Sequence, residues 1–174
     1  SDMVLADDNF ATIVLAVEEG RKIYSNIRKA IQFLLSANIG EVLTLFIDTM
    51  LNWPILFPIH ILWINLVTDT FPALPLGIDE GEKDIMKQKP RPAEASIFAG
   101  GMVTSIVYQG IFQGAITLTA YYIGISNYSQ QVAVTMAFAT LGLIQVSHAF
   151  NERSRYQSIF KLEFFGNKYL VGAA

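Results

Sequence analysis

The chain contains four long apolar blocks, and these blocks constrain its fold more than any other feature. They occupy residues 27–51, 58–78, 97–125 and 132–150. A helix needs roughly 20 predominantly apolar residues to cross a bilayer, and each block is about that long, although the first and third carry interruptions. A fifth apolar block begins at Phe164 and is too short to span by residue 174. We therefore expect the chain to end as a truncated further span.

The basic residues are sorted along the chain in the way that a membrane topology requires. All 12 Lys and Arg residues lie at or before the start of the first block, between the second and third, or after the fourth. The connections at residues 52–57 and 126–131 contain none. Because basic loops tend to remain in the cytoplasm, this pattern predicts that loops 79–96 and 151–163 are cytoplasmic.

These two signals together predict an all-α fold, a transmembrane helix bundle with about four spanning helices. The polar, helix-prone residues 1–26 would form a cytoplasmic stalk, and residues 27–174 would form the membrane domain. At 52% hydrophobic and 16% charged residues, the chain is also more apolar and less charged than a typical soluble domain.

The composition excludes several other classes of protein. The net charge is only −3 and no basic stripe with interleaved aromatic residues is present, so we expect no nucleic-acid partner. Cysteine is absent, which excludes disulfides and thiolate metal sites. The N-terminus is acidic and its first apolar block comes late, so no cleavable signal peptide is indicated.

An acidic residue, Asp69, lies in the middle of the second apolar block. An ionisable side chain at membrane depth is energetically costly and usually marks a site or an ion pathway. Asn65 and Thr68 precede it at helical spacing, so the three side chains would share one face. Pro72 and Pro75 follow closely, and we expect them to break the regular helix and free backbone carbonyls. The pattern indicates a cage of oxygen atoms for a hard cation.

The first apolar block offers a second group of oxygen-bearing side chains. Asn38 and Glu41 are three residues apart and would lie on one helical face. Gly40 between them would allow another helix to approach closely, and the third block carries Gly110 and Gly114, which are also small. We expect the first two spans to be adjacent and to face a shared site.

The chemistry of these side chains favours calcium, because Ca²⁺ takes roughly six to eight oxygen ligands from carboxylates, amides and carbonyls. Magnesium would require a tighter octahedron, and soft metals would require sulfur or imidazole. The alternative is that the polar groups form interhelical hydrogen bonds of about 0.6 kcal/mol each, which suits Asn38 or Thr68 taken alone. Two buried carboxylates, Glu41 and Asp69, must instead be protonated or meet a cation.

Other polar residues in the spans carry weaker signals. Asp48 lies near the outer end of the first span, where reaching the interface is favoured over a place in an exit path. Gln145 is either a neutral ligand or a helix–helix hydrogen bond. His148 is expected at the cytoplasmic interface rather than on a metal, and Gln109 and Gln113 are expected to be packing contacts.

Short motifs along nearly the whole chain resemble one family of membrane proteins. Residues 1–10 (SDMVLADDNF), 17–21 (VEEGR) and 23–24 are similar to the exit from the phosphorylation domain of a P-type ATPase and its stalk. Residues 38–41 (NIGE) and 62–69 (LWINLVTD) resemble the fifth and sixth transmembrane helices of calcium pumps. Residues 84–86 (DIM) and 90–91 (PR) resemble the loop that follows, and the match is looser beyond residue 92.

The resemblance implies a calcium-transporting ATPase of the sarco/endoplasmic-reticulum-like branch, bacterial in character and located in the plasma membrane. Such pumps hydrolyse ATP through an aspartyl-phosphate and export calcium with proton countertransport. Calcium would be the transported ion, while ATP and Mg²⁺ would bind outside this chain. The positions that match calcium ligands of the family are Asn38, Glu41, Asn65, Thr68 and Asp69.

Two positions depart from the reticulum pumps. Gln145 occupies a position where those pumps hold a ligand glutamate, as it does in plasma-membrane calcium pumps, and Thr70 replaces a glycine. Gln145 is therefore a further candidate ligand, and one calcium per cycle is the expectation.

The chain contains no Asp-Lys-Thr-Gly phosphorylation motif and no nucleotide-binding segment. We therefore predict no catalytic or cofactor-binding residue in it, no ATP hydrolysis by this fragment alone, and dependence on a missing N-terminal part of the same pump. Two alternatives remain open: a P-type pump for another cation such as manganese or sodium, and a non-catalytic membrane helix bundle.

Overall fold

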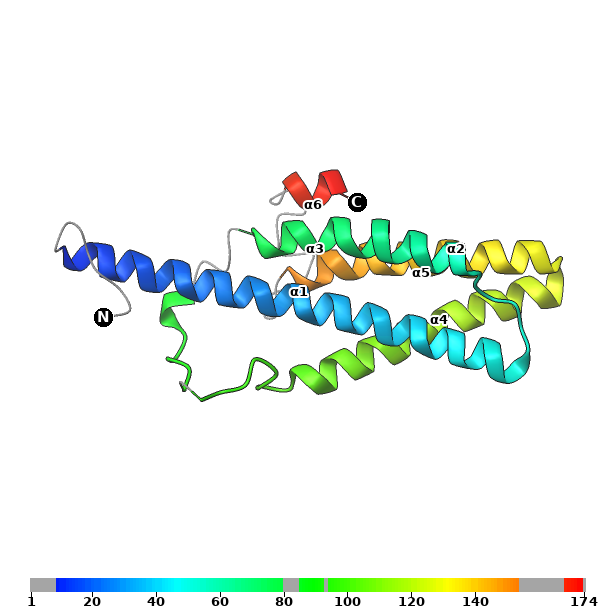
Figure 1. Ribbon diagram of the computed structural model, residues 1–174, viewed down its shortest axis with the longest axis horizontal. Helices are drawn as coiled ribbons and strands as arrows, with labels where there is room; N and C mark the ends of the chain where they lie inside the picture. The colour runs from blue at the N-terminus through cyan, green and yellow to red at the C-terminus, as the bar shows by residue number, and fades with distance from the viewer. Residues whose placement is uncertain (1–8, 80–84, 93, 154–167, 174) are drawn as a thin grey trace.

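The structure, a computed structural model, describes residues 9–79, 85–92, 94–153 and 168–173 (Figure 1). Every regular element in these ranges is a helix, which confirms the all-α prediction. The elements are α1 (Phe10–Leu51), α2 (Pro58–Trp63), the π-helix η1 (Ile64–Asp69), α3 (Thr70–Gly77), the 3₁₀-helix η2 (Ile85–Lys87), α4 (Met102–Asn127), α5 (Gln130–Glu152) and α6 (Lys168–Ala173).

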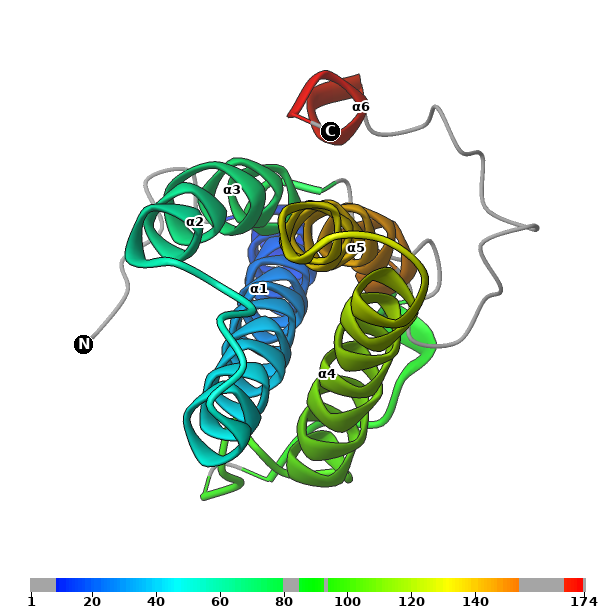
Figure 2. The ribbon, with the colours of Figure 1, turned by 90° about the vertical axis from the view of Figure 1, so that its right-hand side faces the viewer.

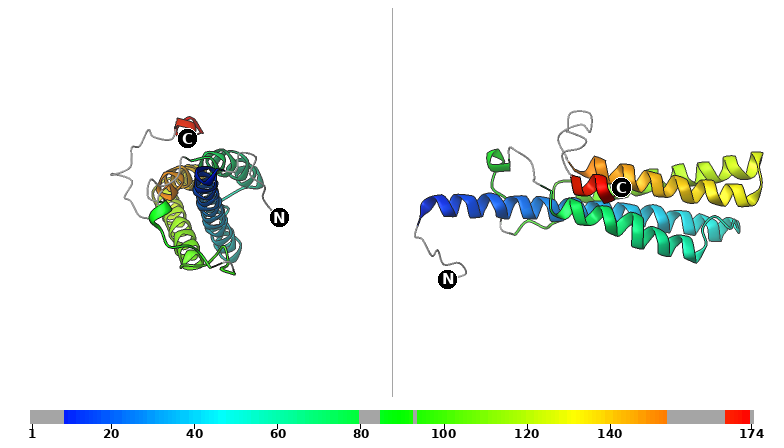
Figure 3. Two further views of the ribbon diagram at one scale, coloured as in Figure 1. Left: turned by 90° about the vertical axis from the view of Figure 1, so that its left-hand side faces the viewer. Right: turned by 90° about the horizontal axis from the view of Figure 1, so that it is seen from above.

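Helix α1 is a single helix of 42 residues that joins the stalk to the first span. It begins at Asn9, whose side-chain oxygen accepts a hydrogen bond of 3.0 Å from the backbone N–H of Ala11, so one free donor of the first turn is satisfied. It continues through Gly20 and ends at Asn52, which takes the left-handed conformation with φ of 52°. Its N-terminal part projects beyond the other helices as the expected stalk (Figures 1 and 3).

The remaining long helices lie alongside the membrane part of α1. Helix α1 packs most extensively against α4, and α4 packs in turn against α5. The row formed by α2, η1 and α3 runs alongside α1 and α5, as seen along the bundle in Figure 2. The short helix α6 packs against α3. Helix α1, helix α5 and the η1–α3 segment therefore meet along one line inside the bundle.

Within the described residues, three helical segments are long and apolar enough to cross a membrane: Phe10–Leu51, Pro58–Gly77 and Gln130–Glu152. Helix α4 is also of spanning length, at 26 residues, but its repeated Gln, Thr and Ser residues lower its hydropathy. It begins at Met102 rather than near residue 97, because residues 97–101 form turns in which Gly100 and Gly101 take positive φ values of 74° and 77°. The third predicted span is therefore displaced towards the C-terminus.

Two apolar clusters lie at opposite ends of the membrane part of the bundle. The cluster nearer the α1–α2 connection contains Ile55, Leu56, Ile64, Tyr121, Ala133, Val134, Ala137 and Leu141. The cluster nearer the stalk contains Phe33, Leu76, Ala149, Phe150 and Leu170. Along α1, η1–α3 and α5, the polar residues predicted for the site fall between the two clusters.

Glycines allow α1 and α4 to approach closely. A Cβ placed on Gly110 would lie 2.4 Å from Ile39 Cγ2 and 3.0 Å from the Ser36 carbonyl oxygen. Gly114 lies opposite Gly40, since a Cβ on Gly114 would be 3.3 Å from the Gly40 carbonyl oxygen. The close approach expected at Gly40 is therefore confirmed, and the small residues of the third block supply the other half of the contact.

Gly110→Ala should destabilise the protein, because the added methyl group overlaps Ile39 and the α1 backbone. Overpacking of this kind typically costs about 1–3 kcal/mol, which a lower thermal unfolding midpoint of the purified protein would report. Gly20→Ala is the matched control, since no atom lies within 4 Å of a Cβ at that position. Alanine should stabilise that helix by up to about 1 kcal/mol. Equal effects of the two substitutions would contradict the packing described here.

Candidate functional site

Glu41 is the residue on which three elements of the bundle converge. It lies on α1 and is only 3% exposed. Its Oε2 accepts a hydrogen bond of 3.1 Å from Asn65 Nδ2 of η1, and its Oε1 accepts one of 2.9 Å from Gln145 Nε2 of α5. Both carboxylate oxygens of Glu41 are therefore engaged by neutral amides from different helices.

Gln145 and Thr68 connect the same site to α5 and η1. Gln145 is fully buried, and its Oε1 accepts a hydrogen bond of 2.7 Å from Thr68 Oγ1. The Thr68 hydroxyl is also 2.9 Å from the carbonyl oxygen of Ile64, one turn earlier. Gln145 thus makes the helix–helix hydrogen bonds that were one of the two roles expected for it. Its partners, Glu41 and Thr68, both belong to the predicted ligand set.

Asp69 is the one acidic group at the site that lacks a hydrogen-bond partner. It is 2% exposed, and neither of its carboxylate oxygens has a partner among the residues that the structure describes. It also lies close enough to Glu41 for the two negative charges to repel each other. A buried charge without a partner costs several kcal/mol, so this carboxylate requires a cation or a proton.

The π-helix η1, which we call a widened turn, lies directly before the α3 segment that contains Pro72. A proline at this position has no N–H to donate to the carbonyl of Thr68, which weakens the regular helical ladder there. The hydroxyl of Thr70 donates to the carbonyl oxygen of Asn65 at 2.8 Å. The helix then continues through both prolines to Gly77, so the expected break is a widened turn and not a helix end.

The π-helical geometry also changes how the three predicted side chains point. We expected Asn65, Thr68 and Asp69 to share one face of a regular helix. In the structure Asn65 reaches α1 through Glu41, whereas Thr68 reaches α5 through Gln145. Single π-helical turns within α-helices are rare and occur frequently at functional sites.

Two of the polar residues considered for a role lie apart from this cluster. Asn38 is exposed, and its amide donates to the carbonyl oxygen of Leu34 on its own helix at 2.7 Å. Asp48 accepts a hydrogen bond of 3.1 Å from the backbone N–H of Ile55, so it holds the connection after α1. The structure therefore brings together Glu41, Asn65, Thr68, Asp69 and Gln145, and leaves Asn38 outside.

The donor set is characteristic of a hard cation. In the described part of the chain, no three His, Cys, Asp or Glu side chains gather closely enough to hold a metal by themselves. The cluster instead combines two carboxylates with amide and hydroxyl oxygens, the ligand types that calcium accepts and that softer metals do not favour.

A second buried polar network lies nearer the stalk, and the sequence analysis missed it. Glu152 Oε1 accepts hydrogen bonds from Gln32 Nε2 at 3.0 Å and from Gln109 Nε2 at 2.7 Å. Next to it, Ser36 Oγ lies 2.7 Å from His148 Nε2. His148, expected at the cytoplasmic interface and not on a metal, is only 7% exposed and contacts α1, and Gln109 does more than pack. The spacing of Gln32, Ser36 and Gly40, every fourth residue, could have revealed this polar face.

Comparison of the sequence with known proteins places the chain in a family. Residues 53–174 match the family described as "Cation transporting ATPase, C-terminus". The "Calcium-transporting ATPase 1" of Bacillus cereus is 48% identical over 98% of this chain and 21% of its own length. The "Calcium-transporting ATPase" of Bacillus subtilis is 46% identical over 99% of this chain and 20% of its own length.

The chain spans about a fifth of the length of these relatives. The family match covers most of the chain, and the apolar helices are those of a multi-pass integral membrane protein. The chain, with its buried oxygen cluster at the meeting of α1, η1 and α5, belongs to the cation-transporting ATPase family and corresponds to its C-terminal membrane region.

Proposed function

We propose that this chain supplies most of the cation site of an ATP-driven calcium pump. The observation that carries the proposal is the buried Asp69 carboxylate, which has no hydrogen-bond partner among the described residues. The two relatives described above are named calcium-transporting ATPases, which supports calcium as the ion. The remainder of a longer protein would bind ATP and Mg²⁺ and perform the phosphoryl transfer.

The proposed ligands are the five clustered side chains Glu41, Asn65, Thr68, Asp69 and Gln145. In the present arrangement the amide nitrogens of Asn65 and Gln145 donate to Glu41. Rotation of either amide would present its oxygen instead, which is the change that an entering cation would favour. The two carboxylates together carry two negative charges, which matches the charge of one Ca²⁺.

Asn38 is proposed as a further ligand that approaches from the open side of α1. Its Oδ1 carries no hydrogen bond in the described part of the chain, and it lies one turn from Glu41. It would join the site from the face that the rest of a longer protein would cover. Water or backbone oxygens freed at η1 would complete the coordination shell.

The continuous helix α1 would transmit movement from the cytoplasm to this site. The stalk and Glu41 belong to one helix, so a shift along the helix axis would move the carboxylate relative to Asn65 and Gln145. Such a shift would change affinity for the cation. When the site is empty, protons on Glu41 or Asp69 would replace the missing charge, which accounts physically for countertransport of protons.

The alternative functions make different predictions. A pump for manganese or sodium would show ATP-driven uptake of that ion that calcium does not suppress. A non-catalytic helix bundle would show no ion-dependent phosphorylation at all. Uptake of labelled ions into vesicles that contain the full-length protein, with competing cations, separates these possibilities.

Asp69→Asn in the full-length protein should abolish calcium-dependent phosphorylation by ATP, because the site loses the carboxylate that has no partner other than a cation. The measurement is acid-stable phosphoenzyme formed with labelled ATP at increasing calcium. Asp48→Asn is the matched control, since Asp48 bonds to the α1–α2 connection and should leave phosphorylation intact. Undiminished calcium-dependent phosphoenzyme in Asp69→Asn would refute the assignment.

Gln145→Glu tests the number of ions. We expect the wild-type protein to bind one calcium per phosphorylatable molecule, because the described residues bring two carboxylates, Glu41 and Asp69, to the site. A third carboxylate at position 145 should permit a second calcium, measured by equilibrium binding of labelled calcium. Asn151→Glu adds an acid at an exposed position of the same helix and should leave the count at one. Two ions bound to the wild type would contradict the proposed stoichiometry.

A further inference from the structure

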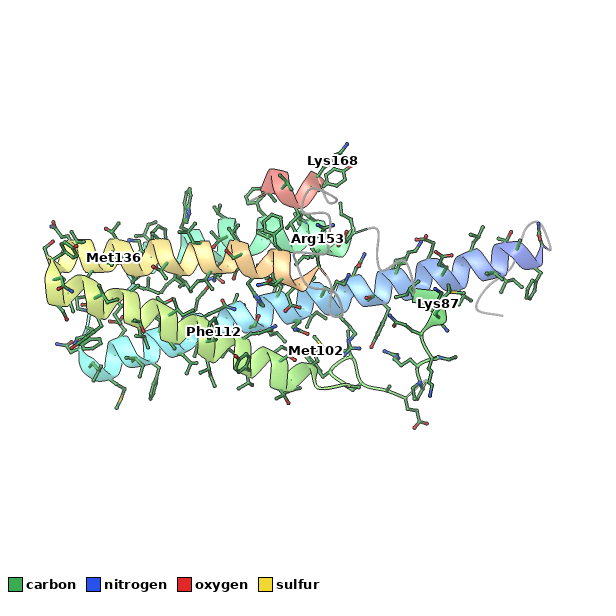
Figure 4. The ribbon with its side chains drawn as sticks, turned by 180° about the vertical axis from the view of Figure 1, so that it is seen from behind. Lys87, Met102, Phe112, Met136, Arg153 and Lys168 are labelled. Atoms are coloured by element: carbon green, nitrogen blue, oxygen red, sulfur yellow. The ribbon has the colours of Figure 1, made fainter. Side chains whose placement is uncertain are left out.

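A second cavity, separate from the cation site, lies between the stalk part of α1 and the segment that contains η2. Its volume is about 480 Å³. Figure 4 shows η2, with Lys87 labelled, beside the stalk. The residues used below that line this cavity are Arg21, Tyr24, Ser25, Arg28, Lys89 and Arg91.

Among the described residues, the charged side chains that line the cavity are all basic. Four of these lining residues are Lys or Arg, and none is Asp or Glu. Arg21 Nη1 donates to the carbonyl oxygens of Ile85 and Gln88 at 3.2 and 3.0 Å, contacts that hold the loop but do not neutralise the charge. Within the described residues, Lys89 and Arg91 form no ion pair. The cavity therefore gathers four basic side chains, and Arg28, one of them, also donates to the carbonyl oxygen of Ala99.

Tyr24 lies at the centre of this group and supplies a neutral donor. The guanidinium carbon of Arg91 is 4.1 Å from the centroid of its ring, and that of Arg28 is 5.9 Å away. The Tyr24 hydroxyl is buried and has no hydrogen-bond partner among the described residues. Two guanidinium groups thus lie against the Tyr24 ring at the wall of the cavity, and planar guanidinium groups suit the oxygens of a phosphate group.

We propose that this cavity binds the phosphate group of an anionic phospholipid in the cytoplasmic leaflet. The shared chemistry is that of any phosphate-bearing anion, so free phosphate is the competing source. The position favours a lipid, because the cavity lies where the stalk enters the first apolar block. The neighbouring side chains Ile23 and Ile27 are 55% and 44% exposed, which suits contact with acyl chains. Basic clusters beside the cytoplasmic end of a span attract anionic lipids.

A bound headgroup would also bridge two parts of the chain. Arg21 and Arg28 belong to α1, whereas Lys89 and Arg91 belong to the loop after the second span. The phosphate would neutralise the repulsion between these cations and hold the loop against the stalk.

The test uses the full-length protein in nanodiscs of phosphatidylcholine with a minor fraction of labelled phosphatidylglycerol. The pocket variant is Lys89→Gln/Arg91→Gln. The control, Lys22→Gln/Lys87→Gln, removes two charges from the same region without touching the cavity lining. Each basic residue that contacts the headgroup contributes about 1 kcal/mol to binding of anionic lipid, so the pocket variant should bind phosphatidylglycerol roughly 30-fold more weakly. Lys22 is already paired with Glu18 and Glu19, so the control should lose much less affinity than the pocket variant.

A second variant and a soluble probe separate the remaining outcomes. Tyr24→Phe keeps the ring beneath the guanidinium groups but removes the hydroxyl. It should weaken lipid binding relative to the wild type. Glycerol phosphate and inorganic phosphate should not displace the labelled lipid. Equal lipid binding by the pocket and control variants would overturn the proposal. Displacement of the labelled lipid by free phosphate would overturn the assignment to lipid. The assignment would also fail if neither the lipid nor free phosphate bound, which is the result expected if another protein segment fills the cavity.

Discussion

Two carboxyl groups, those of Glu41 and Asp69, are buried inside an apolar bundle, and their burial constrains the other parts of this structure. Glu41 is acceptable because two amides donate to it, one from η1 and one from α5. Asp69 has no such partner and is tolerable only with a cation or a proton. The hydrogen bonds to Glu41 link three elements, and the Asp69 carboxylate is buried beside them with no hydrogen-bond partner among the described residues.

The close packing of α1 against α4 makes this arrangement possible. Gly40 directly precedes Glu41, and its neighbours across the contact are Gly110 and Gly114. A larger residue at these positions would push α4 away and let α1 rotate or tilt. The amide contacts at Glu41 would then lengthen. Packing at one face of α1 therefore determines the geometry of the polar cluster at the adjacent face.

The helical membrane bundle could be predicted from the sequence, because the length of the apolar blocks and the distribution of basic residues depend on the membrane and not on tertiary contacts. Glu41, Asn65, Thr68 and Asp69 were identified since each is a polar residue in a long apolar block. The widened turn η1 was not, because two prolines are compatible with several local geometries and only tertiary contacts select among them. The Gln32–Gln109–Glu152 network was also missed, since its members are far apart in the chain and Glu152 lies beyond the fourth block.

The two apolar clusters at the ends of the bundle have a consequence for any ion held between them. One contains Leu141 and Ile64, the other Phe33 and Leu76, and the oxygen cluster lies between these layers. An ion that reached the proposed site past either layer would require that layer to open, because apolar side chains cannot replace the water around an ion. Opening of only one layer at a time would then prevent a continuous leak across the membrane.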